Sequence, residues 1–253
     1  MITIEKKLHG IVLKKIWFAD KPVADNGIIQ YKQAKFADNG CEEFLTLISD
    51  LTETEEEMIA RFSKGCRYKV NRAYRENIKF YIVDSNDIDD TQLNDFLDFF
   101  EDFWKSKKTK LDDRDSLFTE MKSYIKQQAL TLAYASVDGE NVVYHTHIYD
   151  DKTARLLHSA SLFRLKDSTD SSKNIIGMAN RALHYEEMKF FKNKGLAFYD
   201  WGGAGKTEDV ASITEFKESF GGESYTCYDL VQVNGIKAKM ISLISQLKHS
   251  IKG

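Results

Sequence analysis

The sequence predicts a mixed α/β fold, α+β in class, with helices packed against a sheet. Three apolar runs between residues 129 and 163 are separated by turn signals, and Asp138-Gly139 joins the first two. This spacing indicates three antiparallel strands. Helix, strand, helix and strand follow, ending near Val233. Strands and helices in this order favour a sheet covered by helices.

The composition is that of an ordinary globular protein. The chain has 253 residues, enough for one large domain or two small ones, and a net charge of −3, so any contact with nucleic acid is expected to be local. We see no signal-peptide core and no membrane-spanning run, and therefore expect a cytoplasmic protein. Cys41, Cys66 and Cys227 are far apart and lack metal-ligand spacing, so we expect neither a disulfide framework nor a metal.

The first 76 residues predict short strands and then one helix. Thr54 and Glu57 form a capping-box signature, which opens a helix reaching about Glu76. Apolar residues of this helix share one arc of the helical wheel, and basic residues lie opposite. The strands are expected at about residues 12–18, 28–36 and 44–51. The basic residues are Arg61, Lys64, Arg67, Arg72 and Arg75.

The charge changes sign after this helix. Residues 84–102 hold eight acids and no Lys or Arg, and their second half has the periodicity of an amphipathic helix. We therefore place a seam near residues 84–90. The predicted parts are 1–85, 86–233 and a basic amphipathic helix over 234–253.

The second half continues with a regular alternation of elements. The expected elements are helix 115–128, the three strands, helix 177–194, strand 196–201, helix 210–219 and strand 225–233. The C-terminal helix is interpreted as a packing element or a homodimer contact. An anionic membrane surface is the alternative partner for its lysines.

Two passages carry a resemblance to a known family. KGCRYKVNRAYRENIKF is similar to a basic family helix, and ANRALHYEEMKFFKNKGLAFYDWGG with EFKESFGGE is similar to a helix, a strand ending in D-x-G-G and an F-K-x-x-F-G-G segment. Over about Phe44 to Val233 the chain resembles the FemAB-like branch of the GNAT acyltransferase superfamily. The resemblance implies a GNAT-like mixed sheet flanked by helices, with a truncated N-terminal half-module over 1–85 and a fuller GNAT-like module over 86–233.

The resemblance also implies an activity. It is transfer of an acyl or aminoacyl group onto an amine of a cell-surface glycan precursor, either an amino sugar or a peptide, carried by a nucleotide or a lipid. The donor is acyl-CoA, such as acetyl-CoA, or aminoacyl-tRNA; the short chain favours CoA. The alternative from another class is a non-catalytic module that holds RNA or an anionic glycolipid on the basic helix.

Three residues are candidate bases for the amine: His145, His158 and Asp200. His145 and His147 share one strand face and His158 lies on the next strand, so two imidazoles are expected to face a common cleft, unless they fill the sheet as aromatic side chains do. Asp200 either acts as a base or holds the glycine turn by accepting N–H bonds, and we favour the second role. His184 is expected on a helix surface.

The remaining candidates bind donor or acceptor. A loop before a helix is expected to cradle the donor pyrophosphate, unless it is only a lead-in and cap. It comprises Asn174, Gly177, Ala179 and Asn180. Arginine binds phosphate oxygens through two N–H groups, so the basic helix predicts an anion site, with a solvated surface as the alternative. The predicted substrate-binding residues are Arg67, Arg72, Arg75, Trp201, Gly202, Gly203 and Lys217.

Overall fold

The computed structural model divides the chain into two compact units. Unit 1 comprises Met1–Leu45 and Tyr225–Gly253, and unit 2 comprises Thr46–Ser224. The structure describes residues 1–8, 10–107, 113–164, 170–205, 208–236 and 238–239. The predicted parts 1–85, 86–233 and 234–253 do not coincide with these units and stay a prediction. Most of the predicted C-terminal helix, residues 240–253, lies outside the described residues.

Unit 1 is a small sheet built from both ends of the chain. Its strands are β1 (Ile2–Leu8), β2 (Ile11–Trp17), β3 (Gly27–Ala34) and most of β10 (Glu223–Asn234). Strand β2 runs parallel to β3, and the β1–β2 and β3–β10 pairs are antiparallel. Buried side chains such as Ile16, Ile29 and Tyr31 form its core. The sequence prediction missed β1, although Ile2 and Ile4 alternate there and are both buried.

Unit 2 contains a second run of strands, in the order β4-β9-β8-β7-β6-β5. The strands are β4 (Glu42–Asp50, which begins in unit 1), β5 (Ile78–Asp84), β6 (Leu130–Val137), β7 (Glu140–Tyr149), β8 (Thr153–Ser161) and β9 (Phe198–Gly203). The predicted antiparallel meander is confirmed as β6, β7 and β8. Asp138 and Gly139 both have positive φ, as the tight turn between β6 and β7 requires. Only β8 and β9 run parallel among these pairs of described strands.

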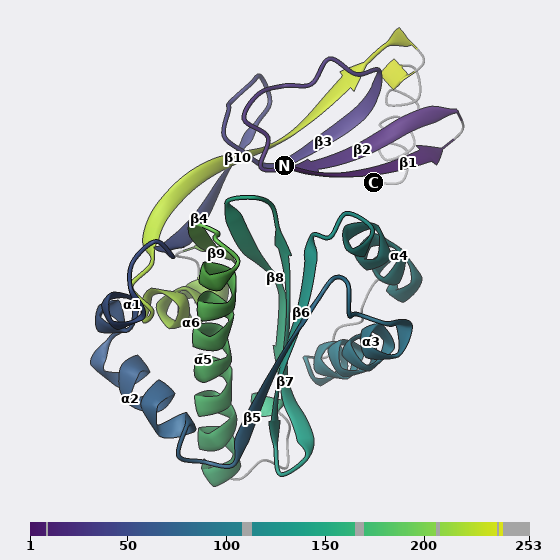
Figure 1. The fold of residues 1–253 in the computed structure, drawn as a ribbon. Helices are drawn as coiled ribbons and strands as arrows, with labels where there is room; N and C mark the ends of the chain where they lie inside the picture. Colours follow the sequence, from purple (N-terminus) through teal and green to yellow (C-terminus); the bar gives the residue numbers. More distant parts are fainter. Residues whose placement is uncertain (9, 108–112, 165–169, 206–207, 237, 240–253) are drawn as a thin grey trace. The chain divides into compact units, whose positions relative to one another are not determined.

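Helices cover both faces of this sheet. Figure 1 shows α5 along one face and α3 and α4 along the other, and α2 packs on α5. The helices are α1 (Glu55–Arg61), α2 (Lys64–Ala73), α3 (Asp90–Ser106), α4 (Arg114–Ile125), α5 (Asp170–Asn193) and α6 (Glu208–Glu218), with a short 3-10 turn at Leu162–Arg164. The predicted mixed α/β class, with helices flanking a mixed sheet, is therefore confirmed.

Two helix predictions need correction. The helix expected over 54–76 is two helices, because Phe62 leaves helical geometry and Ser63 caps α2 by accepting the N–H of Cys66. Apolar residues on both sides of the break remain buried, so the helical wheel did not reveal it. Helix α5 begins at Asp170, seven residues before the expected start. Its first turn is rich in Ser and Asp, which the prediction interpreted as a lead-in.

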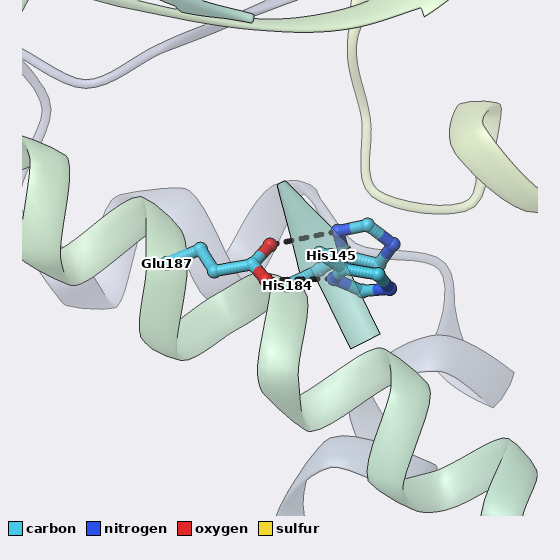
Figure 2. A group of neighbouring side chains, drawn as sticks. All are labelled: His145, His184 and Glu187. Carbon is cyan, nitrogen blue, oxygen red and sulfur yellow. Dashed lines mark hydrogen bonds and ion pairs between the residues drawn. The ribbon is translucent and has the colours of Figure 1, made fainter. Parts of the chain in front are cut away.

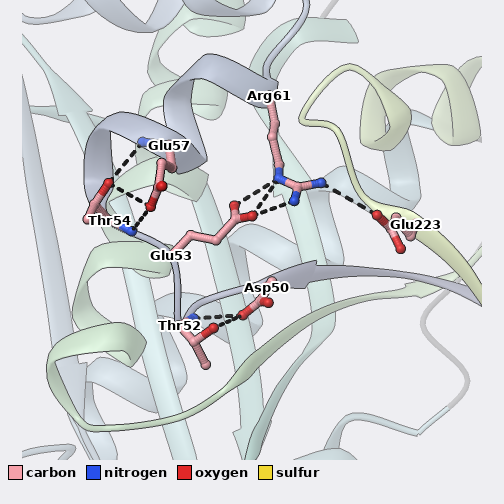
Figure 3. A network of polar contacts seen from close by, with 7 residues as sticks. All are labelled: Asp50, Thr52, Glu53, Thr54, Glu57, Arg61 and Glu223. Carbon is pink, nitrogen blue, oxygen red and sulfur yellow. Dashed lines mark hydrogen bonds and ion pairs between the residues drawn. The ribbon is translucent and has the colours of Figure 1, made fainter.

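The start of α1 shows how local sequence fixes the edge of unit 2. The predicted capping box is confirmed: Thr54 and Glu57 satisfy each other's backbone N–H groups (Figure 3). At the other end of the helix, Arg61 Nε donates to both carboxylate oxygens of Glu53, at 2.9 and 2.8 Å, and its NH1 lies 3.4 Å from Glu223. These contacts hold the segment before α1 and the start of β10 to the same helix.

Candidate functional site

A pocket opens in unit 2 where β8 and β9 separate. The two parallel strands pair only at Thr153–Arg155 with Phe198–Asp200, although β8 continues to Ser161 and β9 to Gly203. Beyond this short ladder, residues of both strands line a pocket of about 670 Å³ together with residues of α5 and α6. The edge of β8 that faces β9 has no ladder partner there among the described strands. Backbone groups at such an edge can bind a ligand.

The pocket is cationic. Arg155, Arg181 and Lys217 line it, and both Arg155 and Lys217 are 9% exposed. Lys217 Nζ donates to the carbonyl oxygen of Gly203 at 2.6 Å. Burial, together with the charge of Arg155, lowers the pKa of Lys217 to about 8, and the charge of Asp200 partly opposes this change. Buried cations of this kind favour a ligand with negative charge.

Aromatic side chains supply the rest of the wall. The Arg181 guanidinium lies 4.7 Å from the centre of the Phe216 ring, close enough for a cation–π contact. Trp201 is fully buried, and its Nε1 donates to Ser49 at 2.9 Å. The pocket therefore suits a ligand with an anionic part and an apolar part.

Asp200 holds the glycine turn. Its Oδ1 accepts the Gly202 N–H at 2.7 Å and lies 2.5 Å from the hydroxyl of Thr46. Gly202 has φ +69°, and a Cβ atom there would lie 3.0 Å from the carbonyl oxygen of Leu156. Only glycine meets both demands without strain. These contacts fit the turn-holding role that the sequence favoured; a role as base stays a prediction.

Behind the pocket lies a buried cluster of histidines around one carboxylate (Figure 2). His145 Nδ1 lies 2.6 Å from Glu187 Oε1, and His184 Nδ1 lies 3.1 Å from Glu187 Oε2. The two imidazole rings stack with their centres 4.1 Å apart. All three side chains are at most 1% exposed. His145 Nε2 contacts Asn180 Oδ1 at 2.9 Å, so the cluster reaches a residue that lines the pocket.

Tyr199 and His147 complete this cluster. The Tyr199 hydroxyl donates to Glu187 Oε2 at 2.8 Å, and its oxygen lies 2.9 Å from both His184 Nδ1 and His147 Nε2. Burial alone would raise the pKa of Glu187, but the charges and hydrogen bonds of His145 and His147 hold it well below its usual range. Burial lowers the pKa of His147, and lowers that of His184 to about 3.

The prediction that His184 lies on a helix surface is wrong. Helix α5 packs on the sheet and on α2, so this face of the helix is enclosed. His184 and Glu187 are three residues apart on one helix face, a spacing that brings side chains together, yet the sequence analysis named neither as a functional residue. The His-x-x-Glu spacing in the sequence is the signal that could have identified this pair.

The prediction that His145 and His158 face a common cleft is also wrong. His158 pairs with Thr146 across the β7–β8 ladder and its Nδ1 lies 2.8 Å from the Thr146 hydroxyl. Neighbouring residues of a strand point to opposite faces, so Thr146 and His158 lie on the face opposite His145. There His158 contacts Phe96 and Phe100 of α3. A catalytic role for either histidine stays a prediction.

The expected pyrophosphate loop is not a loop. Asn174, Gly177, Ala179 and Asn180 all lie inside α5, where backbone N–H groups bond to the helix itself. Gly177 and Asn180 line the pocket, so a role in donor binding stays a prediction for these positions. The helix begins earlier than expected, which moves its N-terminus away from these residues.

The basic helix does not supply the cations of the pocket. Arg72 is exposed and pairs with Glu76 and Tyr68, and Arg75 is exposed two residues beyond the end of α2. Arg67 is half-buried and reaches the carbonyl of Ala60 at 3.5 Å. Sequence reasoning placed Lys217 near the glycine turn, which is confirmed, but missed Arg155 and Arg181.

Three residues of the cluster could also hold a metal ion. Ligand atoms of His145, His184 and Glu187 lie within 4.8 Å of one another. Imidazole nitrogen and carboxylate oxygen are zinc ligands. In the structure these atoms hydrogen-bond to each other, so an ion would have to replace those bonds.

Comparison with known proteins gives structural but no sequence matches. No protein-family model matches the chain, and no curated protein matches its sequence. The structure is similar to FemX, with a TM-score of 0.59 and 12% identity over 79% of this chain and 63% of FemX. The chain therefore spans less than two thirds of that protein.

Two further solved structures are similar over most of their length. One is the C-terminal domain of a protein provisionally named lysylphosphatidylglycerol synthetase from Agrobacterium fabrum, with a TM-score of 0.50 and 15% identity over 97% of this chain and 84% of that one. The other is L-PGS from Bacillus licheniformis, with a TM-score of 0.51 and 16% identity over 87% and 73%. The fold is GNAT-like. Among the described residues, no helix is long and apolar enough to cross a membrane.

Proposed function

We propose that this GNAT-like protein is an acyl- or aminoacyltransferase of the FemAB-like branch, acting on an amine of a cell-surface glycan precursor. The observation that carries the proposal is the cationic pocket at the point where β8 and β9 separate. Activated acyl donors, acyl-CoA and aminoacyl-tRNA alike, combine phosphate groups with an uncharged reactive thioester or ester. A pocket with buried cations and aromatic walls matches that combination.

The similar structures support this reaction class. One bears the name FemX and another the name lysylphosphatidylglycerol synthetase. The two motif passages of the sequence point to the same branch, and their D-x-G-G and F-K-x-x-F-G-G residues meet at the pocket through Gly203 and Lys217.

The residues of the pocket have distinct roles in the proposed reaction. The donor lies along the open edge of β8 with its anionic part near Arg155 and Arg181. The acceptor amine attacks the ester carbon, and negative charge develops on the ester oxygen. Lys217 is placed to stabilise that charge, since a buried cation acts strongly where water is excluded. The N–H of Gly202 is already donated to Asp200 and is not available for this purpose.

Ligand-induced stabilisation tests the proposal. The unfolding midpoint of the full chain is measured with acetyl-CoA, CoA and UDP-linked amino sugars, and transfer is followed by mass spectrometry. A ligand at 100 times its Kd stabilises the folded state by about 2.7 kcal/mol. Stabilisation by CoA species identifies acyl-CoA as donor, whereas stabilisation by UDP-amino sugars alone points to aminoacyl-tRNA.

A matched pair of variants ties the effect to the pocket. Lys217→Met is expected to abolish the stabilisation, and Lys79→Met, an exposed lysine on β5, is expected to keep it. No stabilisation by any of these ligands, together with no transfer from acetyl-CoA or aminoacyl-tRNA, contradicts the proposal.

A second candidate function rests on the exposed face of α2. Tyr68 is 60% exposed beside Arg72, and base stacking on an exposed aromatic next to arginine is typical of RNA contacts. A non-catalytic RNA- or glycolipid-binding module would show steeply salt-dependent binding, lost in Arg67→Ala and Arg72→Ala, with no transfer from any donor.

A further inference from the structure

The buried cluster has one nitrogen that turns toward the pocket. His184 lines the pocket, and its Nδ1 faces Glu187 and Tyr199. No described residue hydrogen-bonds to its other ring nitrogen, Nε2. Figure 2 shows that nitrogen on the side of the ring away from Glu187. Nε2 is therefore the atom of His184 that a bound ligand can reach.

The hydrogen bonds decide which nitrogen of His184 carries hydrogen. Tyr199 gives its hydroxyl hydrogen to Glu187, a carboxylate whose pKa is held low. The oxygens facing His184 Nδ1 can then only accept, so Nδ1 carries the hydrogen. A neutral imidazole with hydrogen on Nδ1 has a free lone pair on Nε2.

His145 holds the carboxylate from its other oxygen. Its Nδ1 lies 2.6 Å from Glu187 Oε1, and its Nε2 faces the amide oxygen of Asn180. Each ring nitrogen of His145 thus faces an oxygen atom, Nδ1 that of the carboxylate and Nε2 that of the amide. The carboxylate is thus fixed between two imidazoles and cannot rotate away from His184.

We propose that His184 is the catalytic residue that removes the proton from the acceptor amine, with Glu187 and His145 as positioning residues. This inference rests on the proposed transferase function. A base held by a third group, next to a cation that stabilises the oxyanion, is the arrangement that acyl transfer needs. His184 and Lys217 line the same pocket.

The step balances without another reactant. The amine lone pair forms the N–C bond to the acyl carbon, and the resulting ammonium is far more acidic than a free one. Its proton passes to Nε2 of His184 while the C–S or C–O bond to the donor breaks. The leaving thiol or hydroxyl group takes that proton, and His184 returns to its neutral form.

The first test needs no substrate. Two-bond ¹H–¹⁵N spectra of the histidine-labelled full chain report which ring nitrogens carry hydrogen, and a His184→Gln spectrum assigns the signal. We expect His184 to be neutral at pH 7 with hydrogen on Nδ1. Hydrogen on Nε2, or on both nitrogens, overturns the proposal.

The second test measures transfer. His184→Gln is expected to lower kcat by about 10²–10⁴-fold, the range for general base catalysis, while acetyl-CoA or aminoacyl-tRNA still binds. Lys79→Met, an exposed lysine on β5, is the control and is expected to keep wild-type kcat. Imidazole added to His184→Gly is expected to restore part of the rate, which a purely structural role would not allow.

The outcomes separate the two proposals. Transfer by the wild type together with unchanged kcat in His184→Gln overturns the role of His184 and leaves the proposed function standing. No transfer by the wild type from either donor overturns the proposed function and the base with it. For Glu187, a changed pH profile of kcat in Glu187→Gln is expected, and an unchanged profile removes it as a positioning residue.

Discussion

Replacing Lys217 by methionine is expected to make the protein more stable. The pKa of this lysine falls from 10.5 to about 8 because the ammonium is buried. A fall of that size corresponds to about 3 kcal/mol of unfavourable free energy in the folded state at pH 7. Methionine fills a similar volume without charge but loses the hydrogen bond to Gly203, worth about 1 kcal/mol. The net expectation is a gain of about 2 kcal/mol.

The sign of the pH dependence follows from the same values. Between pH 8 and 10.5 the unfolded chain binds a proton at Lys217 that the folded chain does not, so the free energy of unfolding of the wild type rises with pH there. The advantage of Lys217→Met is therefore full below pH 8 and disappears toward pH 10.5.

Guanidinium denaturation of both proteins at pH 7, 8, 9 and 10 measures this difference. Titration of all other groups cancels between wild type and variant, and Lys79→Met on the exposed face of β5 controls for loss of an ordinary lysine. A variant less stable than wild type at pH 7, or a difference that does not change with pH, refutes the reasoning. A stability gain combined with lost ligand binding would mark Lys217 as a residue kept for function.

Three further outcomes follow from particular contacts. Gly221→Ala is expected to lower the free energy of unfolding by about 2–4 kcal/mol, because φ is +75° and the new Cβ would lie 2.7 Å from a backbone oxygen of α1. Gly195→Ala, where φ is +82° and the space around the Cβ is open, is the control and is expected to cost about 1–2 kcal/mol. Denaturant titrations measure both costs, and equal costs would contradict the clash at Gly221. Thr46→Val is expected to lower the free energy of unfolding by about 1–3 kcal/mol, since Asp200 loses a buried donor, and an unchanged denaturation midpoint would count against it. Burial lowers the pKa of His184 from 6.5 to about 3, so between these pH values the unfolded chain binds a proton that the folded chain does not, and stability is lost as the pH falls from 6.5. His184→Gln is expected to flatten that decline. An unchanged slope of the denaturation midpoint against pH would contradict the contribution of His184.

Much of the fold could be predicted because its signals are local. The capping box at Thr54 and the turn at Asp138-Gly139 each depend on a few neighbouring residues, and both are confirmed. The break at Ser63 escaped prediction, although Ser63 is itself a good N-cap, because the apolar arc of the helix runs through it without interruption.

The candidate site was less predictable because its contacts join distant parts of the chain. His145 and Glu187 are 42 residues apart, and no spacing rule connects them. His158 was placed on the wrong face because the register of β7 and β8 shifts between Thr146 and His147, an irregularity that alternation alone does not reveal. Lys217 was found because it belongs to the F-K-x-x-F-G-G motif, and the two glycines that it contacts, Gly202 and Gly203, belong to the D-x-G-G motif.

Unit 1 is assembled from both ends of the chain, and this affects the order of events during synthesis. Tyr31 of β3 pairs with Leu230 of β10, which the ribosome adds 199 residues later. At about 5–20 residues per second, β3 waits about 10–40 s for that partner. All of unit 2 is translated in the interval and can fold first, while one edge of β3 stays open to other strands. Nascent chains therefore pass through a period in which one edge of β3 is unpaired and exposed. During that period chaperones can bind the edge, or strands of neighbouring copies can pair with it.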